Sequence, residues 1–313
     1  MENPRPHIGI LKHEKLGYAE EILSQTLETA GLVSSVIKPQ DLAFGDEEFF
    51  PDLLIARCEL SSLSDPILSA YLAYFEECRH RGIPVINSRE FLLRGQHKYL
   101  THAAVRQYLQ SQGLPDTINP PSYLSYNRDR AFELARREID LYGSVVLKHP
   151  CSGRGDGIYL VRDLVELSAC LQSHFTNGEA IMLQRTIEKE KNSLGGFRDI
   201  RVYACRDPKT RTPEVVSAFY RNAAPGQFLT NTSQGGFVTP MPQIDVDLIR
   251  FSKQVMEATQ GDVAGLDFVV DSQGQYRFFE VNIAFETPKK AIDLVGPGIW
   301  EATRDLLVAT LIK

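Results

Sequence analysis

The chain has 313 residues, of which 43% are hydrophobic and 24% charged, a composition typical of a globular protein with a core of ordinary size. The net charge of −6 (34 basic against 40 acidic residues) is not gathered in blocks, which argues against nucleic acid or a membrane as the main partner. No apolar run approaches the ~20 residues that span a bilayer, and the five cysteines show no CxxC spacing. We therefore expect a cytoplasmic protein of two or three small domains, without a disulfide framework or a structural zinc site.

The first 95 residues alternate short apolar runs with helical patterns, which predicts a parallel sheet with helical crossovers. No GxGxxG motif follows the first run, so we interpret this N-terminal α/β domain (1–95) as a substrate-side platform rather than a nucleotide site. The predicted strands and helices are His7–Leu11, Tyr18–Ala30, Val33–Ile37, Asp52–Cys58, Asp65–Arg81 and Pro84–Asn87.

Two further units are predicted after residue 95. Residues 96–187 are expected to form a small central lid, with a helix at about 97–112 and then two β-α-β units separated by a glycine-rich loop. Residues 188–313 have longer alternating strands, which predict an antiparallel sheet with helices at about 245–259 and 297–312 covering one face. The segment 188–196, rich in Lys, Glu and Gly, is expected to be disordered.

A glycine-rich loop follows the strand that ends in Lys148. Its glycines, Gly153, Gly155 and Gly157, would let backbone N–H groups turn toward an anion, although the G-K-[ST] ending of a Walker A loop is missing. Taken alone, the segment is consistent with a phosphate site or with a surface hairpin carrying a solvated lysine. Cys151 lies beside this loop, but no histidine–acid pair is evident near it, so a catalytic cysteine is not expected.

A hairpin near the C-terminus carries two carboxylates and an amide. Glu280 and Asn282 are two residues apart and share one strand face. Asp267 falls opposite Glu280 if the turn has two residues, and opposite Phe279 if it has three. Hard oxygen ligands of this kind select magnesium, whereas an edge hairpin with its acids in water is the alternative. The neighbouring phenylalanines favour burial and hence a metal.

Two arginines on predicted strands are suited to binding anions. Asp199 and Arg201 share a strand face, and the planar guanidinium of Arg201 fits a phosphoryl or carboxylate group, although a cross-strand salt bridge explains the pattern equally well. Arg221, followed by Asn231 and a Gly-Gly turn, would supply a second strand and loop of the same kind, a weak signal by itself.

Taken together, in this order and spacing, these segments resemble the ATP-grasp superfamily, and within it the RimK-type (ribosomal-protein glutamate ligase) carboxylate–amine ligases. The resemblance covers about residues 90–285 and is carried by VVLKHP with the glycine loop, LQRTI, DIRV, Asn231 with Gly235-Gly236, and LDFVVD with EVN. It implies an α/β (α+β) ATP-grasp fold, with an N-terminal parallel-sheet domain, a lid, and a C-terminal antiparallel sheet covered by helices. It also implies ATP and Mg²⁺ (or Mn²⁺) as cofactors.

The resemblance assigns roles to individual residues. Contacts to ATP fall to Lys98, Lys148, Ser152, Gly153, Gly155, Gly157, Gln184, Arg185, Ile187, Glu188 (or Glu190, for the ribose), Asp199 and Asn231. The metal ligands carried over are Asp267, Glu280 and Asn282, and the charge-stabilising catalytic arginines are Arg201 and Arg221.

The chain departs from the family pattern at three places. Arg185 stands where the family has glutamate in the hinge strand that holds adenine. Arg57 sits where the branch has a Pro-Arg-Ile-Gly element near the acceptor, with different neighbours. The segment 283–288 replaces the usual Ser-Pro-Gly, which lines the substrate side in relatives, so an acceptor other than the branch's usual one is expected.

The implied activity is ATP-dependent amide-bond formation through an acyl phosphate, on an amino acid or small peptide. The resemblance is also compatible with a homo-oligomer. Two alternatives stay open: a small-molecule kinase on the same scaffold, and a nucleotide-binding regulatory protein with weakened catalysis.

Overall fold

The computed structural model describes residues 5–12, 17–38, 50–59, 63–152, 157–175, 179–192, 195–223, 230, 235–285, 287 and 289–312. Within these residues the strands form three sheets, two of four strands and one of five. None of the helices described is both long enough and apolar enough to cross a membrane.

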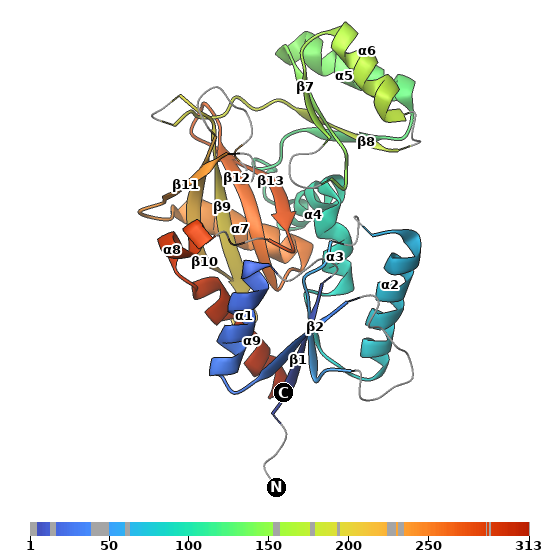
Figure 1. Ribbon diagram of the computed structural model, residues 1–313. Coiled ribbons are helices and arrows are strands. Elements are labelled where there is room, and N and C mark those ends of the chain that lie inside the picture. The colour runs from blue at the N-terminus through green and yellow to red at the C-terminus, as the bar shows by residue number, and fades with distance from the viewer. Residues whose placement is uncertain are drawn as a thin grey trace.

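The N-terminal sheet is parallel, as predicted, with the strand order β2-β1-β3-β4. Helices α1 and α2 lie on either side of it (Figure 1). Its central strands are continuous apolar runs because both faces are covered, one by α1 and the other by α2. The elements are β1 (His7–Leu11), α1 (Tyr18–Thr29), β2 (Val33–Ile37), β3 (Leu53–Ala56), α2 (Asp65–His80) and β4 (Val85–Ile86).

The second unit is an antiparallel sheet with the order β5-β8-β6-β7, which two helices cover with a core of their own (Figure 1). It is smaller than the predicted lid (96–187), because Val105 and Leu109 belong to the core of the C-terminal sheet, and we keep the name lid for residues 122–185. Asn127 caps the first of these helices by accepting a hydrogen bond from the Arg130 N–H, and Gly143 ends it with φ of 76°. The elements are β5 (Ser122–Ser125), α5 (Arg128–Tyr142), β6 (Val145–Lys148), β7 (Ile158–Val161), α6 (Leu164–Phe175) and β8 (Ile181–Arg185).

The C-terminal sheet is antiparallel, with the order β11-β10-β9-β12-β13. Its elements are β9 (Arg198–Arg206), β10 (Pro213–Asn222), β11 (Phe237–Pro240), α7 (Val246–Thr259), β12 (Val263–Val270), β13 (Tyr276–Asn282), α8 (Lys289–Val295) and α9 (Gly298–Leu311). The expectation that α7 and α9 cover one face is wrong. Val202 and Ala204 of β9 belong to the core that contains α7, whereas Tyr203 and Cys205 belong to the core that contains α9. The two helices therefore cover opposite faces, and the sheet is buried on both.

Two short helices lead from the N-terminal sheet to the lid. Ser88 caps α3 (Arg89–Gln96), and His97 caps α4 (Lys98–Ser111). The helix predicted from residue 97 is thus present, while α3, α8 and β11 were not anticipated. Because α4 packs against α7 and β13, it brings its first residue, Lys98, to the C-terminal sheet.

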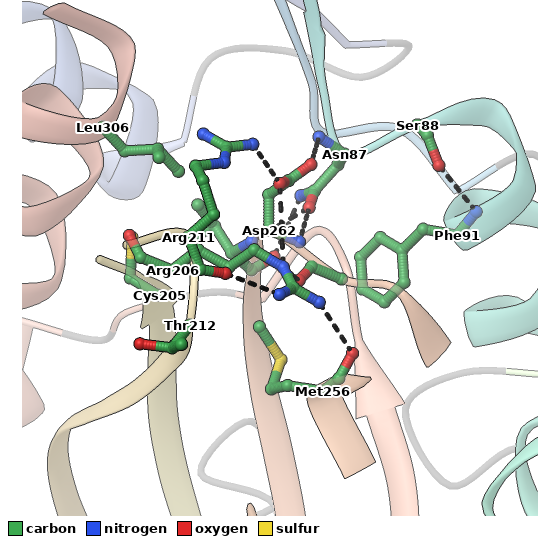
Figure 2. Close-up of polar contacts among 12 residues, drawn as sticks. Asn87, Ser88, Phe91, Cys205, Arg206, Arg211, Thr212, Met256, Asp262 and Leu306 are labelled. Atoms are coloured by element: carbon green, nitrogen blue, oxygen red, sulfur yellow. Dashed lines mark hydrogen bonds and ion pairs between the residues drawn. The ribbon is translucent and has the colours of Figure 1, made fainter. Parts of the chain in front are cut away.

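A polar network joins the N-terminal sheet to the start of β12 (Figure 2). Asn87, buried and with φ of 62°, accepts hydrogen bonds from the backbone N–H groups of Asp262 (3.1 Å) and Val263 (3.0 Å) and donates to the Val263 carbonyl (2.9 Å). Asp262 accepts from the backbone N–H of Asn87 (3.0 Å) and from Arg211 (2.8 Å). Arg206 donates to the carbonyls of Gly261 (2.9 Å) and Arg211 (2.7 Å). We call Asn87, Arg206, Arg211 and Asp262 the interdomain clamp.

Candidate active site

The three residues predicted as metal ligands lie together on the hairpin of β12 and β13. Asp267 is directly opposite Glu280, and Gly265 is opposite Asn282. The Asn282 amide donates to Asp267 Oδ2 at 3.1 Å. The structure therefore gathers two carboxylates and one amide at this place. Among the described residues, no three histidine, cysteine or carboxylate side chains gather as a metal site, so the amide oxygen of Asn282 would have to complete the set.

The register of this hairpin combines the two alternatives left open by the sequence. The turn has three residues between Asp271 and Gln275, and this would place Asp267 opposite Phe279. A β-bulge lies between the pairs Asp267–Glu280 and Phe268–Phe278, so Phe279 is the extra residue and the register shifts by one. The bulge thus restores the pairing of Asp267 with Glu280.

Asp267 is buried and forms ion pairs with two arginines. Its oxygens lie 2.5 and 3.1 Å from Nε and Nη2 of Arg201, and Oδ2 is also 2.8 Å from Nη2 of Arg221. Burial favours protonation, but Arg201 and Arg221 outweigh it and hold the pKa of Asp267 below its usual range. Asp267 is therefore the fixed negative centre of the site.

Glu280 behaves in the opposite way. Burial raises the pKa of Glu280, and the adjacent Asp267 raises it further, against the opposing charges of Lys98 and Arg221. The two carboxyl groups are within hydrogen-bonding contact of each other, an arrangement in which one proton is shared between them. A divalent cation is the other species that can hold two such carboxylates together.

Asp199 forms a second ion pair beside the first. Its Oδ1 accepts from Arg221 Nε at 2.7 Å, and its Oδ2 accepts from the Thr230 hydroxyl. Arg221 therefore bridges Asp199 and Asp267, and both are buried. The cross-strand salt bridge that the sequence left open for Asp199 and Arg201 is present in altered form, because each residue pairs with a partner on another strand.

Both predicted ATP-contacting lysines reach this region. Lys98 Nζ donates to the carbonyl of Ser152, where the glycine-rich loop begins. Lys148 Nζ lies 4.8 Å from the centre of the Phe279 ring and donates to Gln184 Oε1 at 2.5 Å. Burial lowers the pKa of Lys148 to about 7, with Lys98 and Lys189 contributing and Glu280 opposing.

Gln184, in the predicted adenine strand, connects three elements through its side chain. Besides Lys148 it contacts the Ser122 hydroxyl at 3.1 Å and His102 Nε2 at 3.4 Å. His102 is fully buried, lies 3.1 Å from the Phe279 carbonyl, and has its pKa lowered to about 4 by burial. This histidine therefore links the lid to the bulge of β13.

The side chain of Arg185 is turned onto the lid helix α5. It forms a forked ion pair with the buried Glu138 (2.9 and 3.2 Å) and stacks 3.7 Å from the centre of the Tyr142 ring. Glutamate, the usual family residue here, would face Glu138 with a like charge. Arg185, which replaces the usual glutamate, therefore fits the acidic and aromatic neighbours that surround it within the lid.

The structure describes some of the remaining residues predicted to contact ATP and not others. Gly157 has φ of 67°, and its carbonyl accepts from the His149 N–H, which closes the base of the glycine-rich loop. Glu188 is exposed, whereas Glu190 is engaged by Arg198 at 2.7 Å. Ile187 follows the end of β8. Gly153, Gly155 and Asn231 lie outside the described residues.

Arg57 is buried at the boundary between the N-terminal domain and the segment after Asn282. Its guanidinium pairs with Glu20 at 2.9 Å, donates to the Phe285 carbonyl at 3.0 Å, and lies over the rings of Phe285 (5.0 Å) and Trp300 (4.7 Å). Lys12 also reaches Glu20, at 2.5 Å. Arg57 thus ties the N-terminal domain to the segment after Asn282.

Lys189 is a cationic residue of this region that the sequence did not single out. Its Nζ lies 5.2 Å from the Phe279 ring, and it is within electrostatic reach of Asp199, Arg221 and Asp267. It belongs to the segment expected to be disordered, but the described residues 188–192 pair with neighbouring strands. No local motif marks Lys189, because its partners lie far away in the sequence.

The region as a whole carries excess positive charge. We define the charged cluster as the cations Lys98, Lys148, Lys189, Arg201 and Arg221 with the carboxylates Asp199, Asp267 and Glu280. Five cations against three carboxylates leave an excess of two positive charges, and a proton passing from Lys148 to Glu280 leaves this excess unchanged. The cluster is therefore suited to an anion with several negative charges.

Comparisons with known proteins agree with this geometry. Residues 103–294 match the model of the RimK-like ATP-grasp domain family. A curated relative, the uncharacterised MG012 homolog of Mycoplasma pneumoniae, is 24% identical over 215 residues, which are 68% of this chain and 69% of that protein.

Solved structures resemble the whole chain. The D-alanyl-alanine synthetase A of Vibrio cholerae superposes with a TM-score of 0.71 at 14% identity, covering 99% of both chains. The macrocyclase MdnC bound with precursor peptide MdnA, from Microcystis aeruginosa, superposes with a TM-score of 0.65 at 13% identity, covering 96% of this chain and 99% of that one. Because the family model covers well over half of the sequence, the chain belongs to the RimK-like ATP-grasp family and has the fold of the ATP-grasp ligases.

Proposed function

We propose that the protein is an ATP- and Mg²⁺-dependent carboxylate–amine ligase that forms an amide bond through an acyl phosphate, on an amino acid or small peptide. The observation that carries the proposal is the charged cluster, in which lysines from α4 and the lid meet arginines and carboxylates of the C-terminal sheet. The ligases that share the fold, a D-alanyl-alanine synthetase and a macrocyclase bound to a precursor peptide, support the same class of reaction.

The residues on β12 and β13 fit a magnesium ion. Asp267 and Glu280 already share a hydrogen bond, which a cation can replace, and Asn282 supplies an amide oxygen beside them. Both oxygens of Asp267 also accept from arginines, so metal binding requires that at least one of these contacts be exchanged. When bound, magnesium would neutralise charge on the nucleotide phosphates and fix their position.

Residues of this chain would do the rest by positioning and charge neutralisation. Lys98 and Lys148 would bind phosphate oxygens, and the main chain of the segment 184–187 would hold adenine. Arg201 and Arg221 would neutralise charge that develops on the transferred phosphoryl group, a contribution of ~3 kcal/mol or more by analogy with an oxyanion donor. No side chain acts as a nucleophile in this scheme.

The reaction has two steps. A carboxylate oxygen of the acid substrate bonds to the terminal phosphorus of ATP as the bond to ADP breaks, which gives an acyl phosphate. The amine nitrogen then attacks the acyl carbon, phosphate leaves with the bonding electrons, and the nitrogen loses a proton. The buried position of Lys148 and Asp267 supports exclusion of water from the acyl phosphate during these steps.

The direct test is an ADP-release screen over a matrix of amino acids, short peptides and small carboxylates, followed by mass spectrometry. We expect ADP release to require an acid and an amine together, and the product mass to equal their sum less one water. ADP release with no amine and a stable phosphorylated product would instead identify a kinase. Tight ATP binding without turnover in any mixture would identify a regulatory nucleotide-binding protein.

Glu280→Ala tests the metal assignment. We expect nucleotide turnover to fall by at least 100-fold, because a metal carboxylate is lost. The free energy of unfolding should stay close to that of the wild type, since burial and the neighbouring Asp267 disfavour the charged form of Glu280 in the folded protein and raise its pKa. Steady-state ADP release and urea unfolding measure the two effects, and the exposed Glu301→Ala serves as control. Undiminished turnover in Glu280→Ala would refute the assignment.

A further inference from the structure

The segment after the hinge strand β8 is fixed along the β12–β13 hairpin. The Ser272 N–H donates to the Glu188 carbonyl (2.8 Å), and the Glu190 N–H donates to the Val270 carbonyl (2.8 Å). Lys189, between them, forms a bridge with Asp271. Hydrogen bonds on both sides therefore determine where the main chain of Lys189 lies.

Two lysines share the ring of Phe279. Lys148 Nζ from the lid lies 4.8 Å from the ring centre, and Lys189 Nζ from the segment after the hinge lies 5.2 Å from it. Cation–π attraction offsets part of the cost of placing two ammonium groups in a partly buried region. Phe279 is the extra residue of the β-bulge, so the irregularity that pairs Asp267 with Glu280 also provides the platform for both lysines.

The charges around Lys189 are those of the nucleotide site. Burial lowers the pKa of Lys189, Asp199 opposes this effect, and Arg221 and Asp267 are also within reach. Asp199 and Asp267 already accept hydrogen bonds from Arg221 and Arg201. With Lys189 included, the charged cluster has five cations against three carboxylates, and this excess of positive charge attracts an anion.

We propose that Lys189 is a third lysine of the nucleotide site, which binds phosphate oxygens of the nucleotide together with Lys148, on the shared platform of Phe279. This inference rests on the proposed function only in taking ATP as the ligand, and it does not depend on which acid and amine are joined. Lys189 lies within electrostatic reach of both Lys148 and Arg221, so it would contact the same polyphosphate as they do.

Binding measured by calorimetry in the presence of Mg²⁺ tests this proposal without any acceptor substrate. We expect Lys189→Met to weaken ATP binding by about tenfold to a hundredfold, the loss typical of one charge-assisted hydrogen bond, and to change adenosine binding by less than about twofold. Lys189→Arg should keep most of the ATP affinity. The matched control is Lys191→Met, because Lys191 is two residues away, exposed, and placed over Phe197 instead (5.9 Å).

The outcomes separate this inference from the proposed function. If the wild type binds ATP and Lys189→Met binds it equally well, the assignment of Lys189 is overturned while the proposed function stands. Equal losses for ATP and adenosine would also overturn it, since a general distortion of the site would act on both ligands. Absence of ATP binding in the wild type would overturn both. Lys189→Gln provides the same comparison if thermal unfolding shows the methionine variant to be unstable.

Discussion

Strand β9 carries two arginines, Arg201 and Arg206, and the neighbouring β12 has an aspartate near each of them, Asp267 and Asp262. The two arginine–aspartate pairs interact differently. At the charged cluster, Arg201 and Asp267 are 2.5 Å apart and bind each other directly. At the interdomain clamp, Arg206 and Asp262 are 4.0 Å apart, and each binds mainly to other groups. The same residue types on the same two strands thus form two kinds of polar network.

The partners explain the difference. In the charged cluster, Asp267 and Asp199 accept from the side chains of Arg201, Arg221 and Thr230, which can exchange partners by rotation. In the clamp, Arg206 and Asn87 bind mostly backbone carbonyl and N–H groups, which are fixed by the strands themselves (Figure 2). A network of side chains can reorganise around an arriving ligand, whereas a network built on the main chain serves stability.

The largest effect that would test this comparison is expected from Asn87→Ala. The substitution leaves two buried N–H groups and one carbonyl without their partner, so we expect the free energy of unfolding to fall by about 2–4 kcal/mol. ATP affinity of the folded protein should not change, because the clamp is at the other end of the sheet. Urea unfolding and calorimetry measure the two quantities. Asn127→Ala, which removes a helix cap, is the control, with an expected loss of about 1 kcal/mol. An equal loss in the two variants would mean that the clamp contributes no more than a cap.

Gly265→Ala tests whether Arg201 must keep its position. A Cβ atom on Gly265 would lie 3.2 Å from Arg201 Nη1 and 3.0 Å from the Cβ of Phe285, so it would displace the arginine or the segment after β13. We expect nucleotide turnover to fall about tenfold and the free energy of unfolding to fall by about 1 kcal/mol. Gly298→Ala is the matched control, since its Cβ would meet only Val216 at 3.4 Å. Similar turnover in both alanine variants would show that the site tolerates a shifted Arg201.

The smallest expected effect is the pH dependence of the free energy of unfolding, which should have opposite signs for Asp262 of the interdomain clamp and Asp267 of the charged cluster. Burial raises the pKa of Asp262, so the wild type should gain stability relative to Asp262→Asn as pH falls toward the ordinary aspartate value. Arginines outweigh burial and lower the pKa of Asp267, so the wild type should lose stability relative to Asp267→Asn as pH falls below that value. Urea midpoints between about pH 6 and pH 3 measure both slopes. Slopes of the same sign would contradict the contrast drawn between the two networks.

Strand pairing near the site could be predicted from the sequence because it follows from local patterns. Apolar alternation and the glycine turn identified the β12–β13 hairpin, and two turn lengths gave two registers for Asp267. The β-bulge could not be predicted, since an extra residue at Phe279 is stabilised by contacts with His102 and with two lysines from other elements. Sequence therefore predicted two registers, and the β-bulge combines them, one on each side of Phe279.

The roles of Arg57 and Lys189 depend on contacts that no local pattern contains. Arg57 was expected near an acceptor by resemblance, but its guanidinium lies against Phe285 and Trp300, more than 200 residues later in the chain. Lys189 lies in a polar stretch that resembles a disordered linker in composition, and it is ordered by the β12–β13 hairpin. Likewise, helices α7 and α9 were predicted to lie against the C-terminal sheet, but their positions on opposite faces follow only from the burial of both sides of β9.

The ion pair of Arg185 with Glu138 has a consequence for the exchange of nucleotide. It fastens the end of β8 to helix α5, so the predicted adenine contacts belong to the same rigid body as Lys148. The N-terminal sheet is meanwhile tied to the C-terminal sheet at Asn87 and at Arg57, whereas the lid has a core of its own. We therefore expect the adenine contacts and Lys148 to move together when the lid opens. ADP would then lose its contacts to the base and to the phosphates in the same step, and its release would coincide with lid opening.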